Sequence, residues 1–285
     1  MSCPARRAPS AAGPPMPPDG VATPLQVERR QVDPRLGHWL AALRRSLSPD
    51  HLVSSPCPRR RAGWLTQVDV ARLSGLTARA YQAVEQGFRV PGPRVFDGIA
   101  AALQMTPAQV AYMRLLANSR CVEPRPVLAA DEVQALVDSY REPAVAYDHA
   151  WQVLTCNSAF RSAFPAAASG GNLLLWHFTM DARRLFVDWS EQAAELVARL
   201  RLMHARFADS TLLESVVAQL VRMDAYARTL WEAGIDVGAE PSCKTYQLRS
   251  PAGNSYCRTV VQLLPAGAVD LSQRLSVWLP QAGEP

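Results

Sequence analysis

The stretch from Thr66 to Gly87, TQVDVARLSGLTARAYQAVEQG, constrains the fold of this chain more than any other segment. It predicts two short helices joined by a tight turn. Thr66 and Thr77 can each cap a helix, because the first N–H groups of a helix have no partner inside it. Gly75 stands between them, where a chain leaving a helix commonly needs a positive φ that glycine tolerates. Gly87 is expected to end the second helix.

Apolar residues place the two predicted helices against one another. Val70 and Leu73 give the first helix an apolar side, and Tyr81 and Val84 do the same at helical spacing on the second. The small side chain of Ala71 allows the second helix to cross closely over the first. This is the geometry of a helix-turn-helix, whose second helix lies in the major groove of DNA. An αα-hairpin inside an unrelated helical bundle is the alternative.

The order of these residues resembles the Xre/lambda-repressor family of DNA-binding domains over roughly residues 35–117. The resemblance rests on Gln67, Ala71, Gly75-Leu76-Thr77, Tyr81, Val84 and Glu85-Gln86-Gly87. It implies a compact domain of five short helices that binds double-stranded DNA.

Three further helices are predicted around the helix-turn-helix. The first helix of the chain is marked by Leu36, Trp39, Leu40 and Leu43. A fourth helix follows Pro93, and Thr106-Pro107 supplies a cap and a proline at the first position of a fifth. We therefore expect an all-α five-helix domain over residues 33–118. Residues 1–32 hold many prolines and few large apolar side chains, which predicts a disordered tail.

This geometry predicts which side chains contact DNA. The predicted DNA-binding residues are Gln67, Thr77, Ala78, Arg79, Gln82, Ala83, Arg94, Arg59, Arg60 and Arg61. Arg79 can bond guanine O6 and N7, Gln82 can bond adenine, and the alanines can contact a thymine methyl. Gln67 and Arg94 are candidates for phosphate contacts. The Arg59–Arg61 run could clamp a phosphate or enter the minor groove, and a solvated loop explains it equally well.

The charge of the chain is split between its two parts. Residues 1–120 hold 16 Arg and 7 acidic residues, a net charge of +9, whereas residues 121–285 carry a net charge of −4. The two values account for the overall charge of +5. A polyanion is therefore expected to bind at the N-terminal end only. We expect Glu85 to orient the fold through Arg44 or Arg45 rather than to contact DNA.

The hydrophobic period changes after a predicted linker over residues 119–129. A helix opened by Asp131 precedes two predicted strands around a turn, at 144–147 and 151–155. Asn157 then begins a short helix, an order that resembles the start of a PAS-like sensor domain. Long helices are predicted next, at 190–207, 210–222 and 224–233, and three strands close the chain at 245–248, 256–264 and 274–279. Strands at both ends predict an α+β domain over residues 130–281, built on one antiparallel sheet.

The second half also resembles the MmyB-like ligand-binding domain that follows Xre-type domains in actinobacterial regulators. The resemblance rests on the segments 172–176 and 184–189, on Leu230-Trp231, and on Lys244 before the last strands. The chain departs from the family at Ser250-Pro251, where family members often have His-Pro, so no role for that histidine is carried over. The resemblance implies a pocket for an apolar, fatty-acid-like small molecule.

Large apolar side chains of this half are candidates to line such a pocket. The predicted ligand-binding residues are Tyr147, Trp151, Asn157, Leu174, Trp176, Phe178, Phe186 and Trp189. Aromatic residues at this spacing also form ordinary cores, and Asn157 also suits the turn between a strand and a helix. Both interpretations of these residues remain open from the sequence.

The sequence contains no pattern typical of an enzyme. His149, His177 and His204 have no partners at metal-ligand or nucleophile spacing, and the nucleophile-elbow, P-loop and zinc-protease motifs are missing. The six cysteines are dispersed without a CxxC pair, so neither a structural zinc site nor a disulfide framework is expected. No apolar run reaches the length of a membrane span, and the N-terminus lacks the apolar core of a secretory signal.

Together these features predict a cytoplasmic, ligand-responsive transcription regulator without a cofactor, acting as a homodimer on double-stranded DNA. The alternative is a protein-interaction module that retains a degenerate helix-turn-helix, because Ala78 and Ala83 offer no hydrogen bonds to bases.

Overall fold

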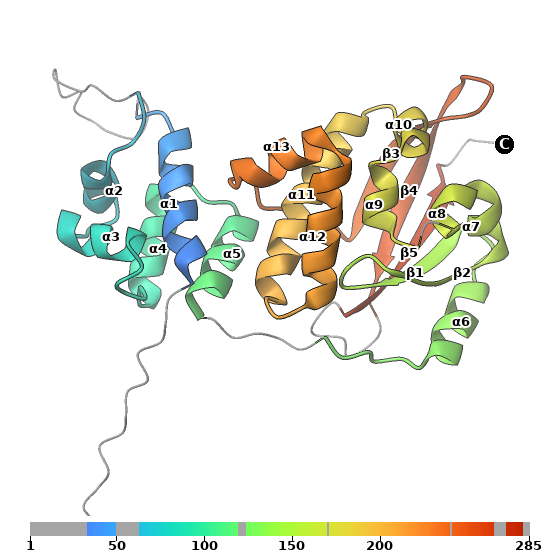
Figure 1. Cartoon of the computed structure of the whole chain (residues 1–285), viewed down its shortest axis with the longest axis horizontal. Coiled ribbons are helices and arrows are strands. Elements are labelled where there is room, and N and C mark those ends of the chain that lie inside the picture. The colour runs from blue at the N-terminus through green and yellow to red at the C-terminus, as the bar shows by residue number, and fades with distance from the viewer. Residues whose placement is uncertain are drawn as a thin grey trace, which may run out of the picture. The chain divides into compact units, whose positions relative to one another are not determined.

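Five helices form the N-terminal part of the protein in the computed structural model, which describes residues 33–49, 63–118, 124–169, 171–239, 241–264 and 272–281 (Figure 1). The helices are α1 (Pro34–Ser46), α2 (Gln67–Leu73), α3 (Ala78–Glu85), α4 (Pro93–Ala102) and α5 (Pro107–Asn118). This number and order agree with the sequence-based prediction. The Arg59–Arg61 run lies outside the described residues.

The helix-turn-helix is formed by α2 and α3. The Thr66 hydroxyl accepts from the Asp69 N–H at 3.2 Å, while the Asp69 carboxylate accepts from the Thr66 N–H at 2.8 Å, so the two residues form a capping box. The Thr77 hydroxyl caps α3 by accepting from the Ala80 N–H at 3.2 Å. Gly75 and Gly87 have φ of 69° and 74°, the left-handed conformation expected where each helix ends.

A close approach at Gly37 brings α1 against the C-terminal end of α3. A Cβ atom at this position would lie 1.9 Å from the Glu85 carbonyl oxygen, so only glycine fits without movement of the backbone. The buried core beneath these helices is formed by Leu36, Leu40, Val70, Tyr81, Ile99, Met113 and their neighbours. Tyr81 and Val84 therefore pack inward, as the helical spacing predicts.

The C-terminal part combines helices with one five-stranded sheet. It begins with α6 (Ala130–Asp138), β1 (Ala144–Asp148), β2 (Val153–Cys156), α7 (Ser158–Ala163) and α8 (Pro165–Ser169). The helices α9 (Leu173–His177), α10 (Met180–Leu185), α11 (Trp189–Arg206), α12 (Thr211–Met223) and α13 (Ala225–Ala233) follow. The last strands are β3 (Cys243–Arg249), β4 (Ser255–Leu263) and β5 (Gln273–Pro280). The predicted fold class, an all-α part followed by an α+β part, is confirmed.

The sheet has the strand order β2-β1-β5-β4-β3 and is antiparallel throughout. Side chains of its central strand, β5, point alternately to the two faces of the sheet. Those from Gln273 to Trp278 are all buried, so both faces of this strand are covered. On one face Leu275 and Val277 pack with α6 through Val133 and Val137. On the other face Trp278 packs with aromatic residues from α7 to α10.

The turn between β1 and β2 differs from the prediction at Trp151. This residue was expected to begin the second strand, but it lies in the turn with a φ of 62°, and β2 begins at Val153. The Asp148 carboxylate accepts from the Ala150 and Gln152 N–H groups at 2.8 and 2.9 Å, which closes a local turn. This side-chain bond competes with the strand ladder and delays the start of β2.

Residues of both parts share one buried cluster. Ala205 of α11 is buried together with the core of the N-terminal helices, and Leu202, Ile235 and Val237 pack against it. The Trp39 indole N–H donates to the Ile235 carbonyl oxygen at 3.2 Å. A direct contact thus exists beside the covalent connection through residues 119–129.

Candidate functional site

The outward side of α3 carries most of the residues predicted to read DNA. Ala78, Arg79 and Gln82 are exposed, whereas Tyr81 and Val84 on the opposite side are buried. Ala83 is half-buried, and the Thr77 side chain is exposed while it caps the helix. The recognition helix therefore presents a polar and small-residue surface that can approach base edges.

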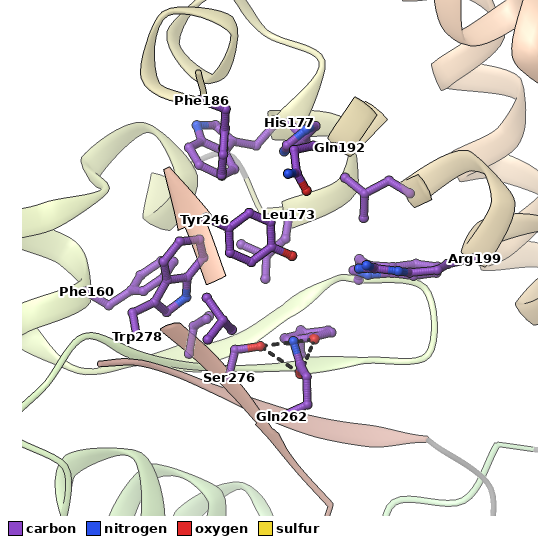
Figure 2. A pocket seen from close by; sticks show the side chains of 16 residues that line it. Phe160, Leu173, His177, Phe186, Gln192, Arg199, Tyr246, Gln262, Ser276 and Trp278 are labelled. Carbon is purple, nitrogen blue, oxygen red and sulfur yellow. Dashed lines mark hydrogen bonds between the residues drawn. The ribbon is translucent and has the colours of Figure 1, made fainter. Parts of the chain in front are cut away.

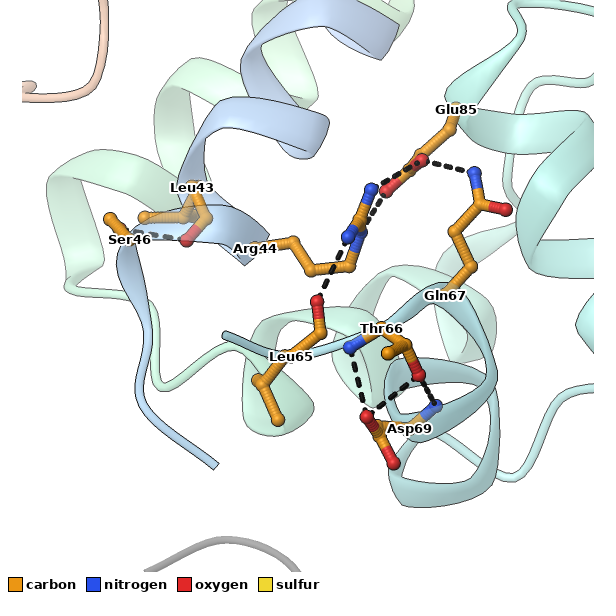
Figure 3. Close-up of polar contacts among 8 residues, drawn as sticks. All are labelled: Leu43, Arg44, Ser46, Leu65, Thr66, Gln67, Asp69 and Glu85. Atoms are coloured by element: carbon orange, nitrogen blue, oxygen red, sulfur yellow. Dashed lines mark hydrogen bonds and ion pairs between the residues drawn. The ribbon is translucent and has the colours of Figure 1, made fainter. Parts of the chain in front are cut away.

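An ion pair holds the end of α3 in place. The Arg44 Nε atom donates to Glu85 Oε1 at 2.7 Å, and a second guanidinium N–H donates to the Leu65 carbonyl oxygen at 2.9 Å (Figure 3). The side chains of Arg44 and Glu85 are 7% and 5% exposed. The structure thus selects Arg44, and not the exposed Arg45, as the partner of Glu85. Burial alone would raise the pKa of Glu85, but hydrogen bonds from Arg44 and Gln67 hold it below its usual value.

Gln67 takes part in this cluster rather than pointing freely outward. Its amide nitrogen donates to Glu85 Oε2 at 2.6 Å (Figure 3). Because an amide nitrogen has two N–H donors, this bond orients the side chain and leaves one donor for a phosphate. Arg94, the other predicted phosphate contact, is exposed in the first turn of α4.

A pocket lies between helices α9 and α11 and the face of the sheet that carries Trp278, and it has a cavity of about 70 Å³. Aromatic side chains form most of its wall, and Figure 2 shows Phe160, Phe186, Tyr246 and Trp278 gathered on one side. Gln192 and Arg199 reach in from α11 on the other side. An apolar wall with a few convergent polar groups is typical of a small-molecule site.

Half of the predicted ligand-binding residues line this pocket, namely Tyr147, Trp151, Trp176 and Phe186. Asn157 does not, because its side chain caps α7 and bonds the backbone at Ala144 and Glu142. Leu174 and Phe178 belong to the core formed with α11 and α12. Trp189 donates through its indole N–H to the His177 carbonyl oxygen at 2.7 Å and also lies outside the lining. These four residues are therefore not part of the lining of this pocket.

Several residues that line the pocket were not predicted from the sequence. Tyr246, Val260, Gln262, Ser276 and Trp278 come from the last three strands, where alternation alone could have placed them on one face. Arg199 comes from the middle of α11 and had no signal in the sequence, because a charged residue in a long helix is ordinarily solvated.

Polar groups form the floor of the pocket. The Tyr147 hydroxyl donates to Gln262 Oε1 at 2.8 Å, and the Ser276 hydroxyl donates to the same oxygen at 2.9 Å. The dashed lines beside Ser276 and Gln262 in Figure 2 mark this network. It joins β1, β4 and β5 and fixes the orientation of the tyrosine ring that faces the cavity.

His177 is a neutral histidine in the pocket wall. Burial, followed by the nearby positive charges of Arg199 and Lys244, lowers its pKa to about 3. The imidazole stacks at 17° to the Trp189 ring and lies 4.6 Å from the Phe186 ring, measured between ring centroids. At neutral pH it therefore contributes a polar nitrogen without a charge.

A second cavity, of about 380 Å³, lies on the opposite face of the sheet beneath α6. Its wall is mainly aliphatic, with Val133, Leu136 and Leu275 among the lining residues. Although it is larger, its Gln273 amide is already bonded to the backbone at Val127 and Leu128. The pocket between the sheet and α11 offers more converging polar groups and is the stronger candidate for specific recognition.

Among the described residues, no three His, Cys, Asp or Glu side chains are grouped so that they could hold a metal ion. None of the helices described is long and apolar enough to cross a membrane.

A helix-turn-helix followed by a domain with an internal pocket defines the class of ligand-sensing transcription regulators. Residues 35–113 match a family described as a helix-turn-helix domain. Residues 129–285, more than half of the chain, match the MmyB-like transcription regulator ligand binding domain, and the chain belongs to this family. The comparison with curated proteins finds no match.

Proposed function

We propose that this protein is a sequence-specific DNA-binding transcription regulator that responds to an apolar small molecule. The observation that carries the proposal is the pairing of an outward-facing α3 with an aromatic pocket between the sheet and α11. The match of residues 129–285 to a ligand-binding domain family supports a small-molecule effector for this part of the chain. A fatty-acid-like effector is the class that the family resemblance suggests.

The DNA contact is proposed to place α3 in the major groove. Arg79 and Gln82 are exposed on this helix and carry donors that suit guanine and adenine edges. Arg94 and the free amide N–H of Gln67 would then contact phosphates on either side. We further propose a homodimer on a palindromic site, because single helix-turn-helix domains cover a short half-site.

The proposal is tested by measuring DNA binding with and without ligand. Genome-wide footprinting supplies the operator, and fluorescence anisotropy then compares this operator with a scrambled duplex. A screen of apolar compounds by thermal shift identifies ligands, since a ligand that binds only the folded state raises the melting temperature. A hit that also changes operator affinity supports the proposal. Equal affinity for operator and scrambled DNA, at several salt concentrations, would contradict it.

A protein-interaction module remains the second candidate. Trp64, Val68 and Phe88, all in the helix-turn-helix part, are 47%, 59% and 82% exposed. Exposed large apolar side chains can mark a protein contact surface. The footprinting and anisotropy measurements also separate this candidate, because an interaction module would show no operator preference.

A further inference from the structure

The cavity beneath α6 has room for a small molecule. Its volume of about 380 Å³ is roughly two and a half times that of an engineered apolar cavity of ~150 Å³ that binds benzene. If the six carbon atoms of benzene set the scale, the cavity holds about fifteen non-hydrogen atoms. It lies on the face of the sheet opposite the pocket that α11 covers, so the two sites are separate.

The wall of this cavity is aliphatic on both sides. Val133 and Val137 line it from α6, and Leu263 and Leu275 line it from the sheet, where they stand opposite each other on β4 and β5. Val133 and Leu275 are 5% and 3% exposed, so the inner part is shielded from bulk water. Removal of apolar surface from water is the main contribution that such a wall can make to binding.

The cavity follows α6 and opens at one side. Its lining residues Val133, Leu136 and Val137 recur at the spacing of one helix face, over about 6 Å of helix, and Tyr140 continues the lining beyond the end of α6. Leu136 and Leu264 are 37% and 47% exposed and mark the opening. An elongated space with an open end suits a chain better than a compact group.

The charged and amide groups of the lining are turned away or already bonded. Arg274 is the only charged residue among those that line the cavity, and its guanidinium lies over the Tyr147 and Trp151 rings, which belong to the pocket on the other face. The Gln273 amide bonds the backbone at Val127 and Leu128. A carboxylate inside this cavity would therefore be buried without a cation, which is strongly unfavourable.

We propose that the cavity beneath α6 binds an unbranched, uncharged alkyl chain. The chain lies between α6 and the last two strands, and its polar end stays in water at the opening beside Leu136 and Leu264. Each buried methylene group strengthens such binding roughly fourfold. The residues matched to the ligand-binding domain family begin at 129, so α6 is part of that domain. This site goes beyond the proposed function, which concerns the pocket between the sheet and α11.

Calorimetric titration of the full chain with three probes tests the proposal. The probes are 1-hexanol, 1-octanol and octanoate. We expect 1-octanol to bind about fifteenfold more tightly than 1-hexanol, because it buries two more methylene groups. Octanoate should bind no more tightly than 1-octanol. Equal affinity for the two alcohols would overturn burial of the chain, and tighter binding of octanoate would overturn the uncharged site.

Two variants on α6 supply the matched test. Leu136→Trp enlarges a side chain at the opening and should weaken binding of 1-octanol about tenfold. Leu136 is part of the lining but only partly buried, so the protein should still fold. Ala135→Trp places the same ring at the adjacent exposed position, which is not part of the lining, and should leave the affinity unchanged. Equal weakening by both variants would overturn the proposal.

Photo-crosslinking locates the chain independently of any variant. The probe is a 1-octanol analogue with a diazirine near the end of its chain, and mass spectrometry identifies the labelled residues. Label on Val133, Leu263 or Leu275 supports the proposal, even if the ring introduced by Leu136→Trp turns to solvent and the affinity is kept. Label on Phe186 or Tyr246, in the pocket on the other face, overturns it.

A second copy of the chain is the other candidate to cover this opening. Sedimentation velocity of the wild type and of Leu136→Trp, with and without 1-octanol, separates the two. An unchanged oligomeric state supports the ligand site. Conversion of a dimer into monomers by 1-octanol and by Leu136→Trp would overturn the proposal and assign the face to a subunit contact. Neither result decides the proposed function, because operator preference is measured separately by anisotropy.

Discussion

Arg44 on α1 and Glu85 at the end of α3 form a buried ion pair, with Arg44 Nε 2.7 Å from Glu85 Oε1. The same arginine bonds the Leu65 carbonyl oxygen just before α2, and the same glutamate binds Gln67 at the start of α2. One pair thus connects α1 with both helices of the helix-turn-helix. The orientation of the recognition helix depends on this connection.

Removal of Glu85 should therefore destabilise the N-terminal part. Glu85→Ala leaves the Arg44 guanidinium buried without its ionic partner, and we expect a loss of about 3 kcal/mol in the free energy of unfolding. Urea denaturation followed by circular dichroism measures this loss. Arg45→Ala, in the exposed neighbouring position, is the control and should change stability by less than about 0.5 kcal/mol. Similar losses for both variants would show that the pair does not hold the fold.

Acid should destabilise the protein through His177. Its pKa in the folded protein is lowered to about 3 from an ordinary value of 6.5, so protonation favours the unfolded state. Its contribution to stability is fully present above pH 6.5 and falls by about 1.4 kcal/mol per pH unit as the pH drops towards 3. Unfolding measured at several pH values should show a shallower decline for His177→Phe than for the wild type.

Two arginines of the proposed DNA-binding surface should have different effects on specificity. Arg79→Ala should reduce operator affinity by about 1–3 kcal/mol and relax the preference at one base pair. Arg94→Ala should weaken operator and non-specific DNA alike, because a phosphate contact carries no sequence information. Anisotropy with the operator and single-base variants measures both effects. If Arg79→Ala loses affinity equally on every sequence, Arg79 does not read a base.

The contact between Trp39 and Ile235 should carry part of the response to the effector. Trp39→Phe keeps an aromatic ring beside Tyr112 but removes the N–H donor to the Ile235 carbonyl oxygen. We expect a stability loss of about 1 kcal/mol and a smaller effect of ligand on operator affinity. Ligand affinity itself should change little, since Trp39 does not line the pocket between the sheet and α11. An unchanged ligand effect on DNA binding would show that the response travels by another route, such as the dimer arrangement.

Local signals in the sequence were sufficient for much of the fold. The hydroxyls of Thr66 and Thr77 begin α2 and α3 as predicted, and Gly75 and Gly87 end them. Such caps act within three or four residues, so their outcome depends little on the rest of the chain. The strands at both ends of the C-terminal part were also predicted, because period-two alternation is a local property.

Only the tertiary structure decided which side chains form the pocket. Hydrophobic periodicity places a residue on the buried side of an element but does not say whether it meets a cavity or another side chain. Trp176 and Phe178 are only two positions apart, yet the first lines the pocket and the second packs against α11 and α12. The tertiary structure also decided that Glu85 pairs with Arg44 rather than Arg45, and that position 37 requires glycine. Each depends on atoms that are distant in the sequence and become neighbours only when the helices pack.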